Sequence, residues 1–147
     1  MRNFIAVAFI TAISFHASCA DDLCTTLQSF ANSNVSSNKK VVELNTRWGG
    51  GLYAPGCKDD ESVEGQALCR YLRAHSSSEY PQDNLNRVLF CLSGEQRHAP
   101  TGFMEELVHV IYHGVAVPGV RKGISIDVEL IRSEDAILRI SVRKIDE

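Results

Sequence analysis

The sequence predicts an α+β domain, in which an antiparallel sheet of three to four strands carries two to three helices on one side. Apolar residues recur at helical spacing in the first two thirds of the chain, and they alternate with polar residues in the last third. Helical and strand-like segments form separate runs, which is typical of α+β domains. Four cysteines beyond the N-terminal segment predict two disulfides.

The first 20 residues predict a secretory signal peptide. They carry a single arginine, an apolar run over residues 4–15, and small residues at Ser18 and Ala20, the −3 and −1 positions of a cleavage site. The run has the length of a signal core and is short for a membrane span. A buried N-terminal helix is the less favoured alternative. Acylation of Cys19 is also disfavoured, because His16 replaces the usual aliphatic residue three positions earlier.

The remaining residues, 21–147, are predicted to form one domain that is large enough to bury a hydrophobic core. Lysine and arginine are scattered, and the chain has a formal net charge of −3. Nucleic-acid binding is therefore not expected, because neutralising phosphates requires clustered cations. No second apolar run has the length of a membrane span, so none is expected in the mature chain. We expect a secreted or periplasmic protein without a cofactor.

Three helices are predicted from apolar residues at helical spacing. The first starts near Asp21 and ends in a polar linker that contains a glycosylation sequon at Asn34. The second follows the acidic residues 59–61, whose charges suit the N-terminal end of a helix dipole. Asp83 is predicted to cap the third helix, and Gly94 is predicted to close it.

Strands are predicted over residues 40–46 and in a C-terminal β-hairpin over residues 123–145. In the hairpin the residues assigned to the buried face are Ile124, Ile126, Val128, Leu130, Leu138, Ile140 and Val142. Ser125 is assigned to the exposed face. Residues 103–113 fit either a helix or a strand, and their many strand-forming residues next to other strands favour a strand.

The four cysteines, Cys24, Cys57, Cys69 and Cys91, contain no CxxC pair, which argues against a zinc knuckle or a redox motif. If the second and third helices form an antiparallel hairpin, Cys69 and Cys91 lie at comparable heights on facing helices. Cys24 is then left for Cys57. The predicted bridges are therefore Cys69–Cys91 and Cys24–Cys57.

His109 and His113 are the strongest metal-ligand candidates, because on a helix they would share one side, one turn after Glu105. On a strand the same spacing separates them by roughly 13 Å, which is too far for one ion. The motif also lacks the glutamate that follows the first histidine in metalloproteases. No metal site is therefore predicted.

No catalytic set is evident in the sequence. The mature cysteines are expected to be oxidised, and no serine lies in a GxSxG or SxxK motif. The carboxylates of residues 59–61 are better explained as a helix start than as an acid–base cluster. Nothing in the sequence orients His75 or His98.

The segment "NTRWGGGLYAPGC", residues 45–57, is the best candidate for recognition. It lacks the lysine and Ser/Thr of a phosphate loop, so its glycines are read as backbone freedom between a strand and Cys57. Arg47, Trp48 and Tyr53 are residue types that are enriched at binding hot spots. The alternative is that Trp48 folds back as a core anchor.

Two functions follow from these observations. The first is an exported binding module, such as an inhibitor or immunity-type protein that occupies an envelope enzyme through Arg47, Trp48 and Tyr53. The second is a small secreted hydrolase whose histidines meet carboxylates only in the fold. The first predicts a recognition loop, whereas the second predicts a histidine–carboxylate cluster in a cleft. A third class, an accessory structural protein of the cell envelope, is not separated from the first by the sequence.

Overall fold

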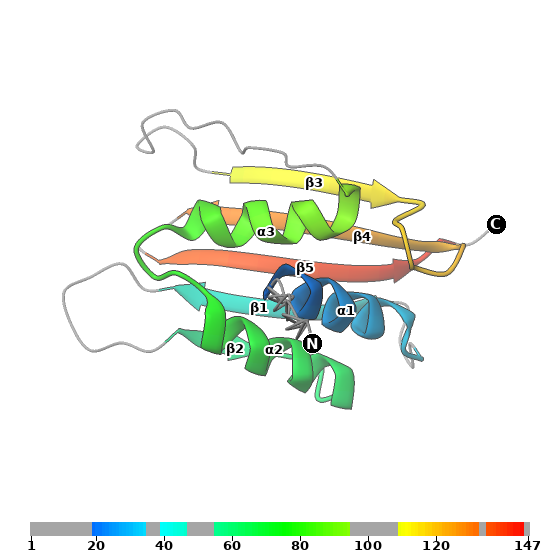
Figure 1. The fold of residues 1–147 in the computed structure, drawn as a ribbon, viewed down its shortest axis with the longest axis horizontal. Coiled ribbons are helices and arrows are strands. Elements are labelled where there is room, and N and C mark those ends of the chain that lie inside the picture. The colour runs from blue at the N-terminus through cyan, green and yellow to red at the C-terminus, as the bar shows by residue number, and fades with distance from the viewer. Residues whose placement is uncertain (1–18, 35–38, 47–54, 95–108, 133–134, 146–147) are drawn as a thin grey trace, which may run out of the picture.

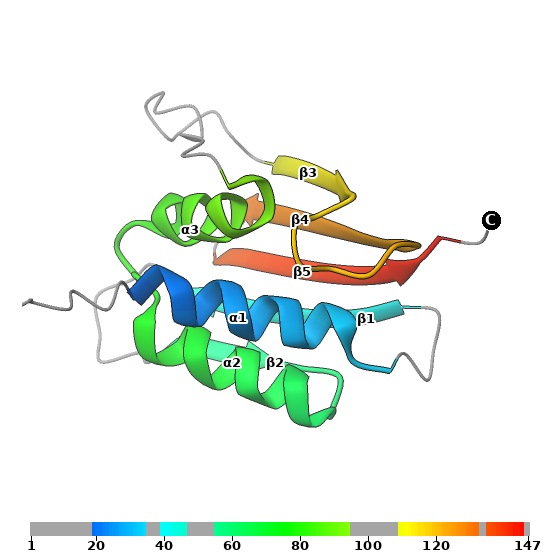
Figure 2. The same ribbon diagram turned by 45° about the vertical axis from the view of Figure 1, so that its right-hand side comes forward.

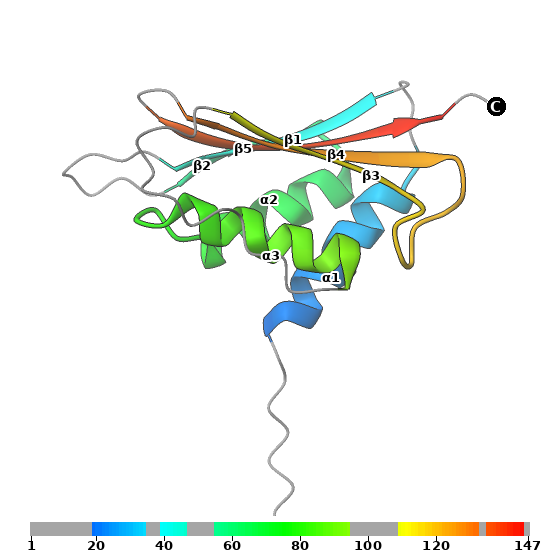
Figure 3. The same cartoon turned by 90° about the horizontal axis from the view of Figure 1, so that it is seen from above.

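The computed structural model describes residues 19–34, 39–46, 55–94, 109–132 and 135–145. These residues form three helices and five strands in the order α1 (Cys19–Asn32), β1 (Lys39–Thr46), β2 (Gly56–Lys58), α2 (Val63–His75), α3 (Pro81–Ser93), β3 (His109–Val115), β4 (Ile124–Arg132) and β5 (Ala136–Lys144). The strands form one antiparallel sheet in the order β2-β1-β5-β4-β3. All three helices lie on one side of it (Figures 1 and 3). The predicted α+β class is confirmed.

The core lies between the helices and one face of the sheet, which we call the covered face. The apolar side chains of the covered face on β1, β4 and β5 include Val42, Leu44, Ile124, Ile126, Val128, Leu130, Leu138, Ile140 and Val142, and all of these are buried. Leu23, Leu27 and Phe30 of α1 are buried in the same cluster. The predicted C-terminal hairpin and its apolar face are confirmed.

The sheet differs from the prediction in the number of its strands and in the extent of β3. The sheet has five strands because β2, a three-residue strand, pairs with β1 and is too short to produce an alternating pattern. β3 covers residues 109–115, so this part of the ambiguous segment is a strand, and residues 103–108 lie outside the described part of the chain.

The third helix starts earlier than predicted. Its N-cap is Tyr80, and Pro81 occupies the first helical position, so Asp83 lies inside the first turn and the predicted cap at Asp83 is wrong. Proline suits this position because its fixed φ angle is helical and the N–H it lacks would have no helical partner. Gly94 ends the helix in the left-handed conformation, with φ 67°, as predicted.

The predicted disulfide pairing is wrong, because α1 lies between α2 and α3 (Figure 2). The structure pairs Cys24 with Cys91 and Cys57 with Cys69. Since α1 packs against both other helices, Cys24 meets Cys91 of α3, and Cys69 of α2 is directed to β2 instead of to α3. The expected hairpin of α2 and α3 as direct neighbours is replaced by this three-helix layer.

No helix in the described ranges is both long and apolar enough to cross a membrane.

Candidate functional site

Arg47, Trp48 and Tyr53 lie outside the described residues, but both flanks of their segment are described. β1 and β2 are antiparallel, with Asn45 opposite Gly56, so residues 47–54 connect two paired strands. On the β1 side, the buried Thr46 hydroxyl donates to the carbonyl of Ala136 on β5 over 3.1 Å. On the β2 side, the Cys57–Cys69 disulfide joins the strand to α2. The two ends of the segment are therefore anchored to the sheet and to a helix.

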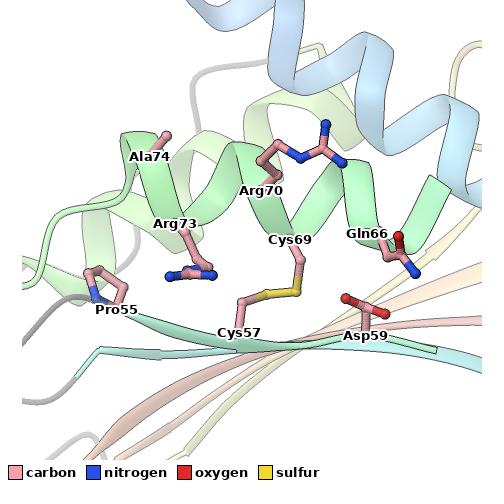
Figure 4. Close-up of a pocket in the computed structure, with 8 residues that line it drawn as sticks. All are labelled: Pro55, Cys57, Asp59, Gln66, Cys69, Arg70, Arg73 and Ala74. Carbon is pink, nitrogen blue, oxygen red and sulfur yellow. A yellow bond between two sulfur atoms is a disulfide. The ribbon is translucent and has the colours of Figure 1, made fainter. Parts of the chain in front are cut away.

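A cleft lies between β2 and α2, next to the end of this segment (Figure 4). It has a volume of about 440 Å³ and is lined by Pro55, Cys57, Asp59, Gln66, Cys69, Arg70, Arg73 and Ala74. The Cys57–Cys69 disulfide crosses it, and Arg73 extends from α2 into the space above β2. Asp59 and Gln66 lie at the other end of the cleft.

The start of α2 accounts for the acidic cluster at residues 59–61. Ser62 is the N-cap, and its hydroxyl oxygen accepts from the N–H of Gly65 at 2.9 Å. Asp59 and Asp60 accept from the backbone N–H groups of Glu61 and Ser62. The carboxylates therefore stabilise a turn before the helix, as the helix-start interpretation predicts.

The second region of interest is the sheet surface opposite the helices, which we call the open face. Its described side chains on β1, β3, β4 and β5 include Val41, Glu43, His113, Ser125, Asp127, Glu129, Ile137, Arg139, Ser141 and Arg143, which the strand register places on one side. No described helix covers this face (Figure 3).

A histidine–carboxylate pair lies on the open face. Nδ1 of His113 on β3 bonds to Oδ1 of Asp127, the residue opposite it on β4. Arg143 of β5 donates to the other oxygen of the same carboxylate. The Asp127 side chain is only 10% exposed, whereas that of His113 is 57% exposed. Asp127 thus orients the imidazole of His113 through Nδ1. The other ring nitrogen, Nε2, is the remaining polar atom of the imidazole.

A row of charged side chains crosses the open face next to the His113–Asp127 pair. Arg139 of β5 donates to Glu43 of β1 over 2.6 Å and to Glu129 of β4 over 3.0 Å. Its hydrogen bond to Glu43, followed by the bond to Glu129, raises the pKa of Arg139 above its usual range. The guanidinium therefore links three strands while it remains charged.

The other predicted histidine sites do not join this pair. Since β3 is a strand, the backbone spacing of His109 and His113 is the extended one, roughly 13 Å along the strand. The His75 ring stacks on Tyr71 of the same helix, with centroids 4.2 Å apart. His98 lies outside the described residues. The described residues contain no group of three or more His, Cys, Asp or Glu side chains that could hold a metal ion.

Sequence reasoning missed both the cleft and the burial of polar groups on the open face. Ser125, Asp127 and Ser141 are less than a tenth exposed, so the assignment of Ser125 to an exposed position is wrong. These short side chains sit among longer ones such as Arg143, the residue opposite Ser125. Alternation identifies their face, but only the strand register shows which long side chains surround them.

Comparisons with protein-family models, with curated proteins and with solved structures find no match to this chain.

Proposed function

We propose that this chain is an exported binding module that acts by occupying another protein, as an inhibitor or immunity-type protein does with an envelope enzyme. Export is supported by the N-terminal sequence, and the two disulfides are compatible with an oxidising compartment. Arg47, Trp48 and Tyr53 are the proposed contact residues.

The observation that carries this proposal is the anchoring of both ends of the segment 47–54. The β1–β2 pairing, the buried Thr46 and the Cys57–Cys69 disulfide hold the positions from which the chain leaves and returns. A recognition loop gains affinity when its ends are held in place, because less conformational entropy is lost on binding. Binding residues are commonly found on loops that a rigid scaffold positions.

The experiment is partner capture with the oxidised mature chain. Cross-linking in envelope extract identifies the partner, and titration then compares wild type with Trp48→Ala. We expect binding to weaken by about 2 kcal/mol or more, the usual hot-spot scale, with the melting temperature nearly unchanged. Tyr80→Ala is a matched control, because Tyr80 is an exposed aromatic residue at the start of α3.

A loss of about 3–5 kcal/mol in folding stability for Trp48→Ala, with binding intact in the folded fraction, would show that Trp48 is a core anchor. That result would remove the segment as the contact site.

A second candidate function, a small hydrolase, is favoured by one observation, the His113–Asp127 pair. A carboxylate that bonds to Nδ1 orients an imidazole for proton transfer at Nε2. The pair lies on the open face, whereas the cleft lies between β2 and α2 at the other edge of the sheet. Binding therefore remains the better supported proposal.

Chromogenic ester, phosphate and glycoside substrates test the second candidate. A hydrolase that uses this pair should lose activity at least about a hundredfold in His113→Gln, the usual contribution of general acid–base catalysis. Equal turnover by wild type and His113→Gln would exclude His113 as the base.

A further inference from the structure

The two arginines of the cleft differ from the other arginines whose side chains are described. The guanidinium groups that donate hydrogen bonds to protein oxygens are those of Arg87, Arg121, Arg139 and Arg143. Within the described part of the chain, Arg70 and Arg73 have no such partner and are exposed. A guanidinium has five N–H donors in a planar fork, and no described residue accepts from those of Arg70 or Arg73.

The charge of the cleft is opposite to that of the chain. Its lining contains two arginines and one carboxylate, Asp59, whereas the chain as a whole has a formal net charge of −3. Oδ1 of Asp59 already accepts from the Glu61 N–H at 2.8 Å, in the turn before α2. The cleft therefore favours an anionic group at its Arg73 end.

The remaining lining residues suit an organic ligand better than a small inorganic anion. The sulfur atoms of Cys57 and Cys69, the ring of Pro55 and the methyl group of Ala74 provide apolar contact area. Gln66 provides an amide at the end opposite Arg73 (Figure 4). Mostly apolar walls with a few placed polar groups are typical of ligand sites.

We infer that this cleft binds a carboxylate-bearing segment of the protein partner, with Arg73 as the principal cation and Arg70 as a second cation one turn away. Arginine matches the planar geometry of a carboxylate and binds it through two parallel hydrogen bonds. The apolar walls receive the aliphatic stem of a glutamate or aspartate. The inference rests on the proposed function, because it names the chemistry that the partner presents beside the 47–54 segment.

The test is calorimetric titration of the full oxidised mature chain with two acetylated peptides, Ser-Glu-Gly-Glu-Ser amide and its glutamine counterpart, at low ionic strength. The glutamate peptide should bind at least about tenfold more tightly than the glutamine peptide, the scale of a hydrogen bond between charged groups. Arg73→Gln should weaken binding about tenfold. Arg70→Gln should weaken it about threefold, as for an exposed ion pair.

Lys122→Gln is the matched control, because it removes one exposed positive charge outside the cleft lining. Its effect should stay below about twofold. Since Arg70 and Arg73 have no protein partner in the described residues, their variants should fold normally, which a melting curve verifies. Equal losses of peptide affinity in Lys122→Gln and Arg73→Gln would show that binding depends only on overall charge, and this would overturn the inference.

A titration with inorganic phosphate completes the test. If phosphate binds with the same dependence on Arg73 while the glutamate peptide does not bind, the cleft is a small-anion site and the inference is wrong. The peptide titration requires no captured partner, because both probes are synthetic peptides of defined sequence. The peptide titration thus reports on the cleft even if partner capture fails, so the two proposals fail separately.

Discussion

The two faces of the sheet are made by neighbouring residues of the same strands, yet they follow different physical rules. On the covered face, side chains such as Ile126 and Ile140 are completely buried under the helices. On the open face, their neighbours Asp127 and Arg139 are held in ion pairs that cross between strands. Apolar burial stabilises the first face, and electrostatic pairing organises the second.

This difference indicates where sequence change is tolerated. A buried apolar position accepts neither a charge nor a cavity, whereas an exposed ion pair contributes roughly 1 kcal/mol or less. Exposed polar residues can therefore vary on the open face at little cost in stability. Each face also holds residues that depart from this pattern: the covered face holds a charged residue, Lys40, and the open face holds the nearly buried Asp127.

The largest expected effect comes from a charge introduced on the covered face. Leu138→Asp should unfold the domain, at a cost above about 4 kcal/mol, because Leu138 is 2% exposed and the carboxylate would have no partner there. Ile137→Asp, at the preceding residue on the open face, should cost about 1 kcal/mol. Urea unfolding measures both. Equal costs would show that the faces are wrongly assigned.

The two disulfides are expected to have the next largest effects, one within the helical layer and one between that layer and the sheet. Cys24–Cys91 joins two helices and closes a separation of 67 residues, and Cys57–Cys69 joins α2 to the sheet edge across 12 residues. Chain entropy predicts losses of about 4 kcal/mol and about 3 kcal/mol for the respective double alanine variants. Urea midpoints at constant m-value give the order, and a reversed order would contradict the entropic explanation.

Peptide mapping without reduction checks the connectivity itself. The structure requires a linked fragment that contains Cys57 and Cys69.

Lys40 tests the cost of a charge on the covered face. Its ammonium group donates to the Phe30 carbonyl and to the carbonyl and hydroxyl oxygens of Ser33, at the end of α1. Lys40→Met should lose about 1–3 kcal/mol at neutral pH, because these oxygens lose a charged donor. Lys39→Met, at the preceding exposed residue, is the control.

The effect of Lys40 should also depend on pH. Burial lowers the pKa of Lys40 from its usual 10.5. Between the folded-state pKa and 10.5 the unfolded chain binds more protons at this site, so the contribution of Lys40 to stability rises with pH there and falls as pH drops through the folded-state pKa. The stability difference between wild type and Lys40→Met should therefore widen from neutral pH toward pH 10.5. A constant difference would contradict the lowered pKa.

The smallest expected effect belongs to the open face. Arg139→Gln removes both ion pairs of the charged row, but these side chains are a quarter to a third exposed, so the loss should be about 1 kcal/mol or less. Added salt should reduce the difference further, because it screens partly exposed charges. A loss above about 3 kcal/mol would show that the row behaves like a buried network.

Local sequence patterns predicted the helices and strands well, but they predicted poorly which of these elements pack against one another. The alternation from Ile124 to Val142 identifies both hairpin strands and their buried face, because the side-chain period of a strand is a local property. The helix end at Gly94 follows from its freedom to adopt a positive φ angle. The start of α3 was misplaced because the proline at its first position outweighed Asp83 as a start signal.

The candidate sites were less accessible to sequence reasoning. The pairing of His113 with Asp127 depends on the register of β3 against β4, and the cleft depends on the packing of α2 above β2. Neither relation has a periodic signal, because the residues involved are distant in the chain or belong to a three-residue strand. Arg47, Trp48 and Tyr53 remain predictions from composition.

By itself the sequence determined the class of this protein: an α+β domain with oxidised cysteines, three helices, and a C-terminal hairpin with one apolar face. These follow from residue type and spacing, which act within a few residues. Only the tertiary structure decided that α1 packs between α2 and α3, that Cys24 therefore pairs with Cys91, and that Arg73 faces an open cleft. The physical reason is that many pairings of the same amphipathic elements bury similar apolar area, and the choice among them depends on how all the side chains pack together.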